Sequence, residues 1–440
     1  MTATHGRPAE GSLRQRFTPA RMFLALYAVS LTIDLLVGLI FRFRTSPFAL
    51  EADEREYYEI ARGMLAGTVE LTPRRSLGFP VLEAAFQQVT GNFIVLQCAI
   101  AAIYALSAPL LFLLVRRLTN DMRVATASAV ALMLWPPALY YGISLYSEAV
   151  ALPLLLLTLV VLPVGSRLGT APVHSGVLAF ASGACLALTT HVRPMYLLFL
   201  PVVLLIVVLE ERRIPIAIKR FGLIVAGFGL LIAPWSIFMS TRYHHVIVVT
   251  SNGGETLAGG LTPQLLKMQG NHQIRLNDRA TWVGPGKWLP LQSNGYLSGA
   301  ELGLPYDEMD ALLKARTVQW AKDHPADAAY LEFSKLRYMW GLSAPADNDA
   351  NQTIFGAVPT IILLCASIAC WLMIPQMRVR YPRLWLLPLF VSGVALISWG
   401  SWRFRQAGDA GLLAFCVIGV FMLLESRRHQ APLTTPAAPA

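Results

Sequence analysis

The chain has 440 residues, of which 55% are hydrophobic and only 14% are charged, and its formal net charge is +10. This composition is too apolar for an ordinary soluble protein and indicates an all-α integral membrane protein. The positive charge is no evidence for nucleic-acid binding, because it gathers in the segments expected on one side of the membrane.

Ten apolar runs of about 20 residues are long enough, or nearly so, to cross about 30 Å of hydrocarbon as helices. They lie at about 22–41, 94–114, 124–141, 147–164, 176–190, 195–209, 221–240, 354–374, 384–399 and 408–424. The first run follows four arginines but lacks a small-residue cleavage site, so we expect a retained helix and no signal peptide. The sequence therefore predicts about ten transmembrane helices.

Five parts follow from these runs. We expect a cytoplasmic N-terminus (1–21), a transmembrane catalytic module (22–240) with a first outer loop (42–93), an extracytoplasmic loop domain (241–352), C-terminal transmembrane helices (353–425) and a disordered cytoplasmic tail (426–440).

The charges of the connecting segments predict the orientation. With both termini in the cytoplasm, the inner segments hold 17 Lys and Arg against 5 acids, as the positive-inside rule requires. The long loop 241–352, with 10 basic and 11 acidic residues, is then a nearly neutral outer domain. We expect a multi-pass protein of the inner (plasma) membrane whose site faces the periplasm or the exterior.

The first outer loop begins with a dense group of charges. Residues 50–67 read LEADEREYYEIARGMLAG, where apolar residues recur at helical spacing and indicate a surface helix that ends near Gly67. Asp53 with Glu56 fits a capping box, which would explain Asp53 as a helix cap. It does not explain Glu51 and Glu54, and crowded carboxylates near lipid favour a functional site. Tyr57 and Tyr58 are most simply part of an interfacial aromatic belt, with stacking on a sugar as the alternative.

Three further surface helices are predicted. One lies at about 80–90, before Gly91, and two lie in the long loop at 307–322 and 326–340, separated by His324-Pro325.

These residues resemble the GT-C membrane glycosyltransferases, in particular the group of protein O-mannosyltransferases and aminoarabinose transferases. The resemblance covers nearly the whole chain in order. It rests on Asp53-Glu54 with Tyr57, Ala61, Met64-Leu65 and Gly67, on Gly78-Phe79-Pro80, on LYSEA at 145–149, HVRP at 191–194, TSNGG at 250–254, DHP at 323–325 and RFR at 403–405.

The resemblance implies a fold of many membrane helices with surface helices in the first outer loop and a small outer domain before the last three spans. It implies transfer of a sugar, with inversion, from a polyprenyl-phosphate carrier to an acceptor hydroxyl on a glycolipid, glycan or protein outside the membrane. Such chemistry requires a carboxylate base and cations near the departing phosphate. By the resemblance Asp53 is the catalytic base, and Glu54 is a candidate for binding the acceptor or supporting the base. We expect no cofactor and no metal.

Candidate phosphate ligands are cations at outer helix ends, since the arginine fork can donate two parallel hydrogen bonds. They are Arg74, Arg75, His191, Arg193, Arg403 and Arg405. For Arg74 and Arg75, snorkelling to lipid headgroups is an equal alternative, and His191 alone at a helix end fits a surface residue. Glu148 is a candidate for binding the acceptor or orienting an arginine, and an ion pair is its alternative role.

Two other functions compete with glycosyl transfer. A flippase for lipid-linked sugars needs charged residues distributed through the spans, where Asp34 is nearly alone. A polysaccharide polymerase or ligase would also use outer arginines, and the carboxylate group after the first helix argues against it. The residues do not identify the sugar or the acceptor.

Overall fold

The computed structural model describes residues 18–50, 52–163, 165, 174–268, 291–342 and 357–430. Every regular element within these ranges is a helix, which confirms the predicted all-α class. Glu51, the expected domain boundary at 352/353 and residues 431–440 of the expected tail lie outside the described residues.

The apolar helices fall on the ten predicted runs. Within the described residues, five helical segments are long and apolar enough to cross a membrane, namely Pro19–Arg42, Phe93–Thr119, Ser175–Val192, Ile214–Tyr243 and Trp402–Arg427. Five more are apolar but shorter, namely Met122–Met133, Glu148–Val161, Pro194–Glu210, Val358–Met373 and Pro382–Ile397. Together they indicate an integral membrane protein.

Several of these segments are built from two elements. The apolar part comprises α1 (Pro19–Val37) with η1 (Gly38–Arg42), α4 (Phe93–Tyr104), α5 (Ser107–Thr119), α6 (Met122–Met133), α7 (Pro136–Gly142), α8 (Glu148–Val161), α9 (Ser175–Val192), η3 (Pro194–Phe199) with α10 (Leu200–Glu210), α11 (Ile214–Tyr243), α18 (Val358–Met373), α19 (Pro375–Arg380), α20 (Pro382–Ile397) and η6 (Trp402–Arg405) with α21 (Gln406–Gln430).

The third predicted run, 124–141, is interrupted. Helix α6 ends at Met133, and Trp135 has the extended ψ of 111° before α7 begins at Pro136. Proline clashes with a helical residue before it, so the Pro136-Pro137 pair starts a new helix. The apolar run predicted the position of the segment but not this break.

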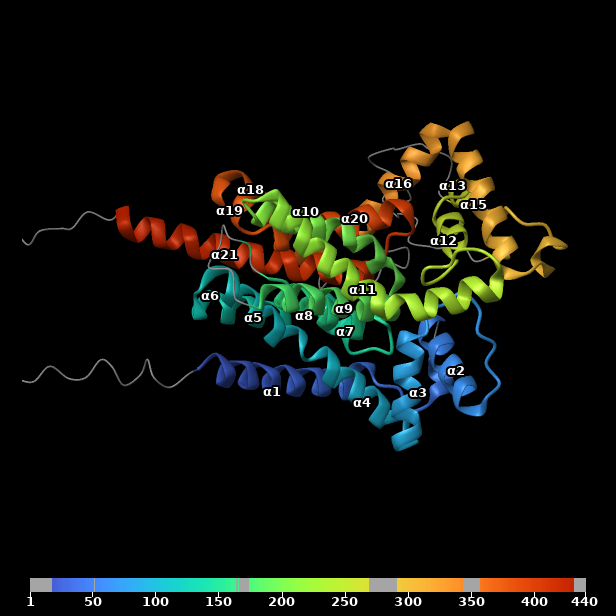
Figure 1. Cartoon of the computed structure of the whole chain (residues 1–440), viewed down its shortest axis with the longest axis horizontal. Coiled ribbons are helices and arrows are strands. Elements are labelled where there is room, and N and C mark those ends of the chain that lie inside the picture. The colour runs from blue at the N-terminus through green and yellow to red at the C-terminus, as the bar shows by residue number, and fades with distance from the viewer. Residues whose placement is uncertain are drawn as a thin grey trace, which may run out of the picture.

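The bundle is held together by close helix contacts. Helix α9 packs on both α8 and α11, and α21 packs on α20, α18 and α6 (Figure 1). At the contact of α9 with α11, a Cβ on Gly183 would lie 1.9 Å from the carbonyl oxygen of Ile224, and one on Gly227 would lie 2.0 Å from that of Phe180. Small residues let membrane helices approach this closely.

The remaining helices gather at one end of the bundle (Figure 1). They are α2 (Ala52–Ala66), α3 (Gly78–Thr90), α12 (Gly253–Gly260), α13 (Pro263–Met268), η4 (Glu301–Gly303), α15 (Tyr306–Asp323) and α16 (Pro325–Met339), with the single 3₁₀ turn η2 (Pro47–Ala49) before α2. These bounds confirm that α2, α3, α15 and α16 are helices at the predicted positions. Helices α2 and α3 end before Gly67 and Gly91, whose φ values of 68° and 58° are left-handed.

The bundle holds more buried charge than the sequence predicts. Asp34 is not nearly alone, because Asp409 on α21 is fully buried and pairs with Arg405 at 3.2 Å. Arg383 on α20 forms a bidentate pair with Glu210 of α10, at 2.6 and 2.7 Å. These charges are paired rather than arranged as a path, which argues for a structural role.

Arg383 also donates to three backbone carbonyls at the end of α8. Its guanidinium lies 2.7 Å from the oxygen of Leu159, 2.9 Å from that of Leu162 and 2.7 Å from that of Pro163. It therefore satisfies carbonyls that have no partner within the helix and ties α8, α10 and α20 together.

Replacing Arg383 should destabilise the protein. Arg383→Leu leaves a buried carboxylate and three carbonyls without their partner, and we expect a loss of about 3–5 kcal/mol. Thermal unfolding in detergent, followed by loss of the monodisperse protein, measures the change. The control is Arg380→Leu, at an exposed position on α19, which should change stability by no more than about 0.5 kcal/mol. Equal behaviour of the two variants would contradict this role.

A second test concerns Glu83, which is fully buried where α3 packs on α2. Neither carboxyl oxygen has a hydrogen-bond partner, and burial, then the negative charge of Glu54, raise the pKa of Glu83 well above its usual range. A raised pKa in the folded state stabilises the protein at low pH, and this stability is lost as the pH rises through that value. Glu83→Gln should therefore raise the unfolding temperature, increasingly from pH 5 to pH 8. An effect that is largest at pH 5 would contradict the assignment.

Candidate active site

Asp53 lies between two arginines at the end of the bundle. Helix α2 begins at Ala52, so Asp53 is in its first turn, and the capping-box interpretation is wrong. One carboxylate oxygen accepts a hydrogen bond of 2.8 Å from Arg75, and the other accepts one from Arg403. The Asp53 side chain is only 17% exposed, so both ion pairs are largely shielded from water.

These arginines control the protonation of Asp53. Burial alone would raise its pKa, but the positive charges of Arg403 and Arg75 and the hydrogen bond from Arg403 outweigh burial. The pKa of Asp53 is therefore held well below its usual range. In this state the carboxylate is ionised but weakly basic.

Local sequence features bring the arginines to Asp53 from distant parts of the chain. Gly78 packs on the end of α9, where a Cβ would lie 2.5 Å from the carbonyl oxygen of His191, and this contact places the loop that carries Arg75. Arg193 ends α9 in an extended conformation, as expected before Pro194. Arg403 stands on the 3₁₀ turn η6.

Glu148, at the start of α8, joins two of these arginines. Its carboxylate lies 2.8 Å from Arg193 and 3.4 Å from Arg403. Ser147 accepts a further hydrogen bond of 2.9 Å from Arg193. Thus the LYSEA, HVRP and RFR segments, far apart in sequence, meet at one point, and Glu148 is the ion-pair partner that the sequence left as an alternative.

Two predicted phosphate ligands lie elsewhere. Arg405 is fully buried and contacts Asp409, the carbonyl of Met339 and the hydroxyl of Thr360. Residues two apart on a 3₁₀ turn point in different directions, so only Arg403 faces Asp53. His191 bonds at 3.1 Å to the carbonyl of Leu231 on α11.

Arg74 joins the first outer loop to the long one. It donates two hydrogen bonds of 3.0 Å to Glu255 on α12 and one of 2.6 Å to Glu56 on α2. Glu255 also accepts from Tyr306 of α15. The backbone amide of Ser251, in the TSNGG segment, donates a hydrogen bond of 2.7 Å to the carbonyl oxygen of Pro73. Arg74 is therefore a tether between the loops.

Glu54 points away from Asp53. It accepts a hydrogen bond of 3.2 Å from the amide of Leu145 and lies 3.7 Å from Arg42. Arg42 in turn donates to Ser144, at 2.6 and 3.0 Å. Glu54 thus ties α2 to the α7–α8 connection, which supports a positioning role for the helix that carries Asp53.

A cavity of about 500 Å³ opens beside Asp53. Its polar end is formed by Asp53, Arg75, Arg193 and Arg403. Tyr57 also lines it, buried against Phe79 at a ring distance of 5.2 Å, so the aromatic-belt interpretation of Tyr57 is wrong. The other walls are largely apolar, although Thr250, Asn252, Thr256 and Ser398 also line them. The apolar side chains come from η3, the segment 246–249, α20, the turn before η6 and η6 itself, namely Met195, Leu197, Leu198, Val246, Val248, Val249, Val394, Ile397, Trp399 and Phe404.

Glu56, Glu255 and most of this apolar wall were not predicted from the sequence. The apolar run VIVV at 246–249 follows α11 directly and was a usable signal for the wall. In the sequence Glu56 fits a capping box or the polar face of a surface helix, and nothing near Glu255 in sequence indicates its pairing with Arg74.

The part of the chain with described coordinates contains no group of three or more His, Cys, Asp or Glu that could hold a metal. The carboxylates of the site face arginines instead.

Comparisons with known proteins give one similar structure. No protein-family model matches the chain, and no curated protein matches it. Among solved structures, the archaeal oligosaccharyltransferase AglB from Archaeoglobus fulgidus, in complex with an inhibitory peptide and a dolichol-phosphate, is similar at 14% sequence identity with a TM-score of 0.49. The match covers 95% of this chain and 52% of that chain, so this chain spans about half the length of that structure.

Proposed function

We propose that the chain is an inverting glycosyltransferase of the GT-C kind, with about ten transmembrane helices, that moves a sugar from a polyprenyl-phosphate carrier to an acceptor hydroxyl. The observation that carries the proposal is the cavity beside Asp53, because one space combines a carboxylate, three arginines and apolar walls. A donor with a phosphate, a sugar and a hydrocarbon chain needs all three features.

The residues divide the reaction between them. Arg193 and Arg403, which share Glu148 as an ion-pair partner, bind the phosphate of the donor. Arg75, which pairs with Asp53, adds a further positive charge on the side of Asp53. Asp53 accepts the proton of the acceptor hydroxyl while its oxygen attacks the anomeric carbon. The bond from that carbon to the phosphate oxygen breaks, and polyprenyl phosphate leaves with the bonding electrons.

Charge balance links donor binding to the activity of Asp53. In this structure four arginines (Arg74, Arg75, Arg193 and Arg403) pair with four carboxylates (Asp53, Glu56, Glu148 and Glu255). A donor phosphate therefore binds by taking arginine contacts from the carboxylates. When it does so at Arg403, Asp53 loses its strongest neutralising charge, its pKa rises, and it becomes a better base.

The apolar wall opens to the surface, as a lipid chain requires. Val246 is 85% exposed, Ile397 is 56% exposed and Leu198 is 42% exposed, although all three line the cavity. Apolar side chains that face the hydrocarbon of a membrane avoid the free-energy cost of exposing apolar surface to water. They support a path by which the polyprenyl chain leaves the cavity for the bilayer.

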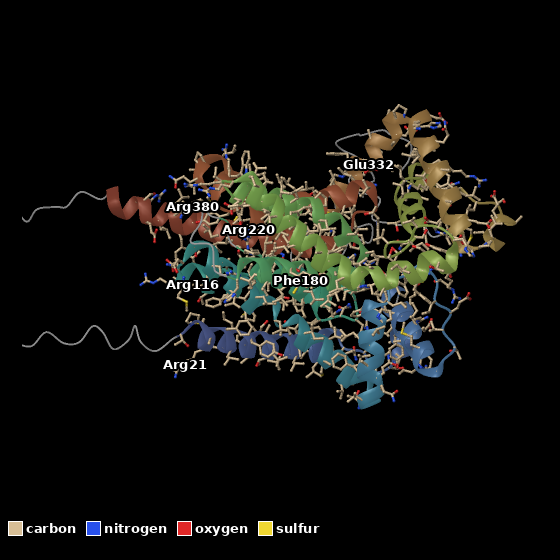
Figure 2. All side chains as sticks on the ribbon, viewed as in Figure 1. Arg21, Arg116, Phe180, Arg220, Glu332 and Arg380 are labelled. Carbon is tan, nitrogen blue, oxygen red and sulfur yellow. The ribbon has the colours of Figure 1, made fainter. Side chains whose placement is uncertain are left out.

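The proposed orientation puts the site outside the cytoplasm. Arg21, Arg116 and Arg380 lie at the end of the bundle opposite to α2 and α3 (Figure 2). Arginine-rich helix ends face the cytoplasm by the positive-inside rule, so the site faces the periplasm or the exterior and both termini are cytoplasmic. We expect the donor, the acceptor and the bilayer as its partners, and neither metal nor cofactor in the reaction.

The test is donor turnover by the purified full chain in nanodiscs. With a panel of polyprenyl-phosphate sugars and a mixed acceptor extract, wild type should release free polyprenyl phosphate. Asp53→Asn keeps the size and the hydrogen-bonding atoms of the side chain but cannot accept the proton. It should lower kcat by about 10²–10⁴-fold while the unfolding temperature shows a folded protein.

The matched control is Asp323→Asn, which changes an exposed carboxylate at the end of α15 and should leave turnover unchanged. Equal release by wild type and Asp53→Asn would remove Asp53 from the chemistry. No release by wild type with any donor would contradict the proposal and favour a polymerase, ligase or flippase.

A further inference from the structure

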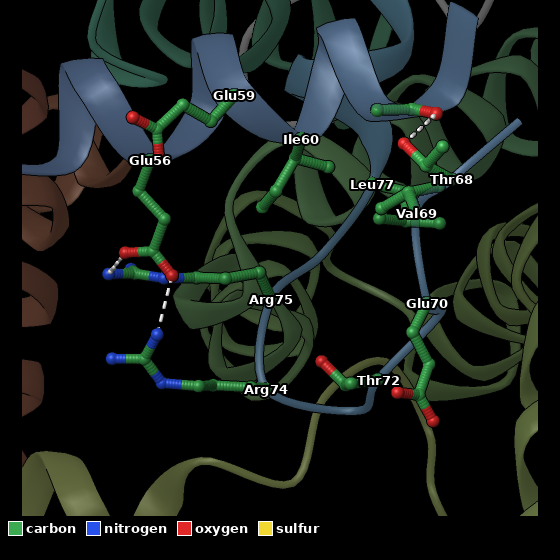
Figure 3. A pocket seen from close by; sticks show the side chains of 11 residues that line it. Glu56, Glu59, Ile60, Thr68, Val69, Glu70, Thr72, Arg74, Arg75 and Leu77 are labelled. Carbon is green, nitrogen blue, oxygen red and sulfur yellow. Dashed lines mark hydrogen bonds and ion pairs between the residues drawn. The ribbon is translucent and has the colours of Figure 1, made fainter. Parts of the chain in front are cut away.

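A second cavity, of about 370 Å³, also has Arg75 in its wall. It is formed between α2 and the loop that returns from α2 to α3 (Figure 3). Its walls are Glu56, Glu59, Ile60, Gly63, Thr68, Val69, Glu70, Thr72, Arg74, Arg75 and Leu77. The donor cavity shares only one of these residues, Arg75.

The two cavities meet at a single guanidinium group. The same Nη2 atom of Arg75 lies 2.8 Å from Asp53 and 2.6 Å from Glu56. Asp53 faces the donor cavity, whereas Glu56, one helical turn later on α2, faces the second cavity. A molecule in the second cavity is thus separated from the carboxylate of Asp53 by one ion pair.

This arrangement matches the geometry of an inverting transfer. The nucleophile and the departing phosphate must lie on opposite sides of the anomeric carbon. Arg193 and Arg403 are on the donor side, and they do not line the second cavity. An acceptor that enters from the second cavity can deliver its hydroxyl to Asp53 from the side away from the phosphate.

The lining indicates the chemical class of the acceptor. The charges of Arg74 and Arg75 are already matched by carboxylates, as Figure 3 shows for Glu56. Glu59 adds exposed negative charge, and so does Glu70, which lies 3.8 Å from the exposed Arg242, so the lining carries no unmatched positive charge to attract an anion. Carboxylates accept hydrogen bonds from hydroxyls.

The cavity also has an apolar face. Ile60, Val69 and Leu77 line it and can contact the C–H face of a sugar ring. Carboxylates that accept hydrogen bonds from hydroxyl groups, beside a small apolar face, suit a neutral carbohydrate.

We propose that the second cavity is the acceptor site and that it takes a neutral glycan with a free hydroxyl. This inference rests on the proposed function, because it assigns the second substrate of the same reaction. It also assigns a gating contact, since the pair of Arg75 with Glu56 has to open for the hydroxyl to reach Asp53.

Labelling with a photoreactive sugar tests the site without any turnover. A diazirine-bearing maltotriose is photolysed with the full chain in nanodiscs, and the labelled peptides are identified by mass spectrometry. We expect labelling within 56–77, competed by unlabelled maltotriose and weaker with a sulfated maltotriose of the same length. Thr72→Trp fills the cavity and should reduce labelling by about tenfold or more, whereas Thr90→Trp, at an exposed position on α3, should not.

The outcomes separate this inference from the proposed function. Specific labelling elsewhere, no competition by maltotriose, or stronger labelling by the sulfated sugar would overturn the assignment of a neutral glycan to this cavity. Competition by a peptide extract and not by maltotriose would do so as well and would point to a protein acceptor. Failure of wild type to release polyprenyl phosphate bears on the proposed function, whereas the labelling result decides the sugar site independently.

Discussion

The bridge of Asp53 to Arg75 and Arg403 is the contact on which the site depends. It joins the first outer loop to the turn before α21, residues 350 positions apart in the sequence. Glu148 continues the bridge to Arg193 at the end of α9. Four parts of the chain, namely the first outer loop, the start of α8, the end of α9 and the turn before α21, are thereby held at one end of the bundle by charge. Asp53, Arg75 and Arg403 each have two partners of opposite charge, and all are largely buried, so removing one of them weakens the pairing of its neighbours.

The sequence was sufficient for the class and for the main helices. Runs of apolar residues predicted all the apolar segments, because a helix in a bilayer must satisfy its backbone internally and its length is fixed by the hydrocarbon thickness. Gly67, Gly91 and Pro325 marked helix ends through backbone geometry that is local. The interruption before Pro136 and the buried pair of Arg383 with Glu210 depend on contacts between helices, and local patterns carry less information about them.

For the site, the residue types were more predictable than their roles. Asp53, Arg75, Arg193, Arg403 and Glu148 meet, as a pattern of acids and arginines at outer helix ends suggested. Arg405 and His191 face other partners, because the direction of a side chain at a helix end follows from one or two backbone angles. Arg74 pairs with Glu255, 181 positions away, and no local pattern contains that pairing. Which arginine can bind a phosphate is therefore a property of the tertiary structure.

We propose that a donor phosphate takes Arg403 from Asp53 and thereby makes Asp53 a stronger base. The direct measurement is the pH dependence of transfer, with kcat/KM for the donor reporting the free enzyme and kcat reporting the donor complex. Asp53 in the free enzyme has a pKa well below its usual range, so the fall of kcat toward low pH should begin at a higher pH than the fall of kcat/KM. If kcat and kcat/KM began to fall at the same pH, or if kcat began to fall at the lower pH, the exchange of arginine partners would be contradicted.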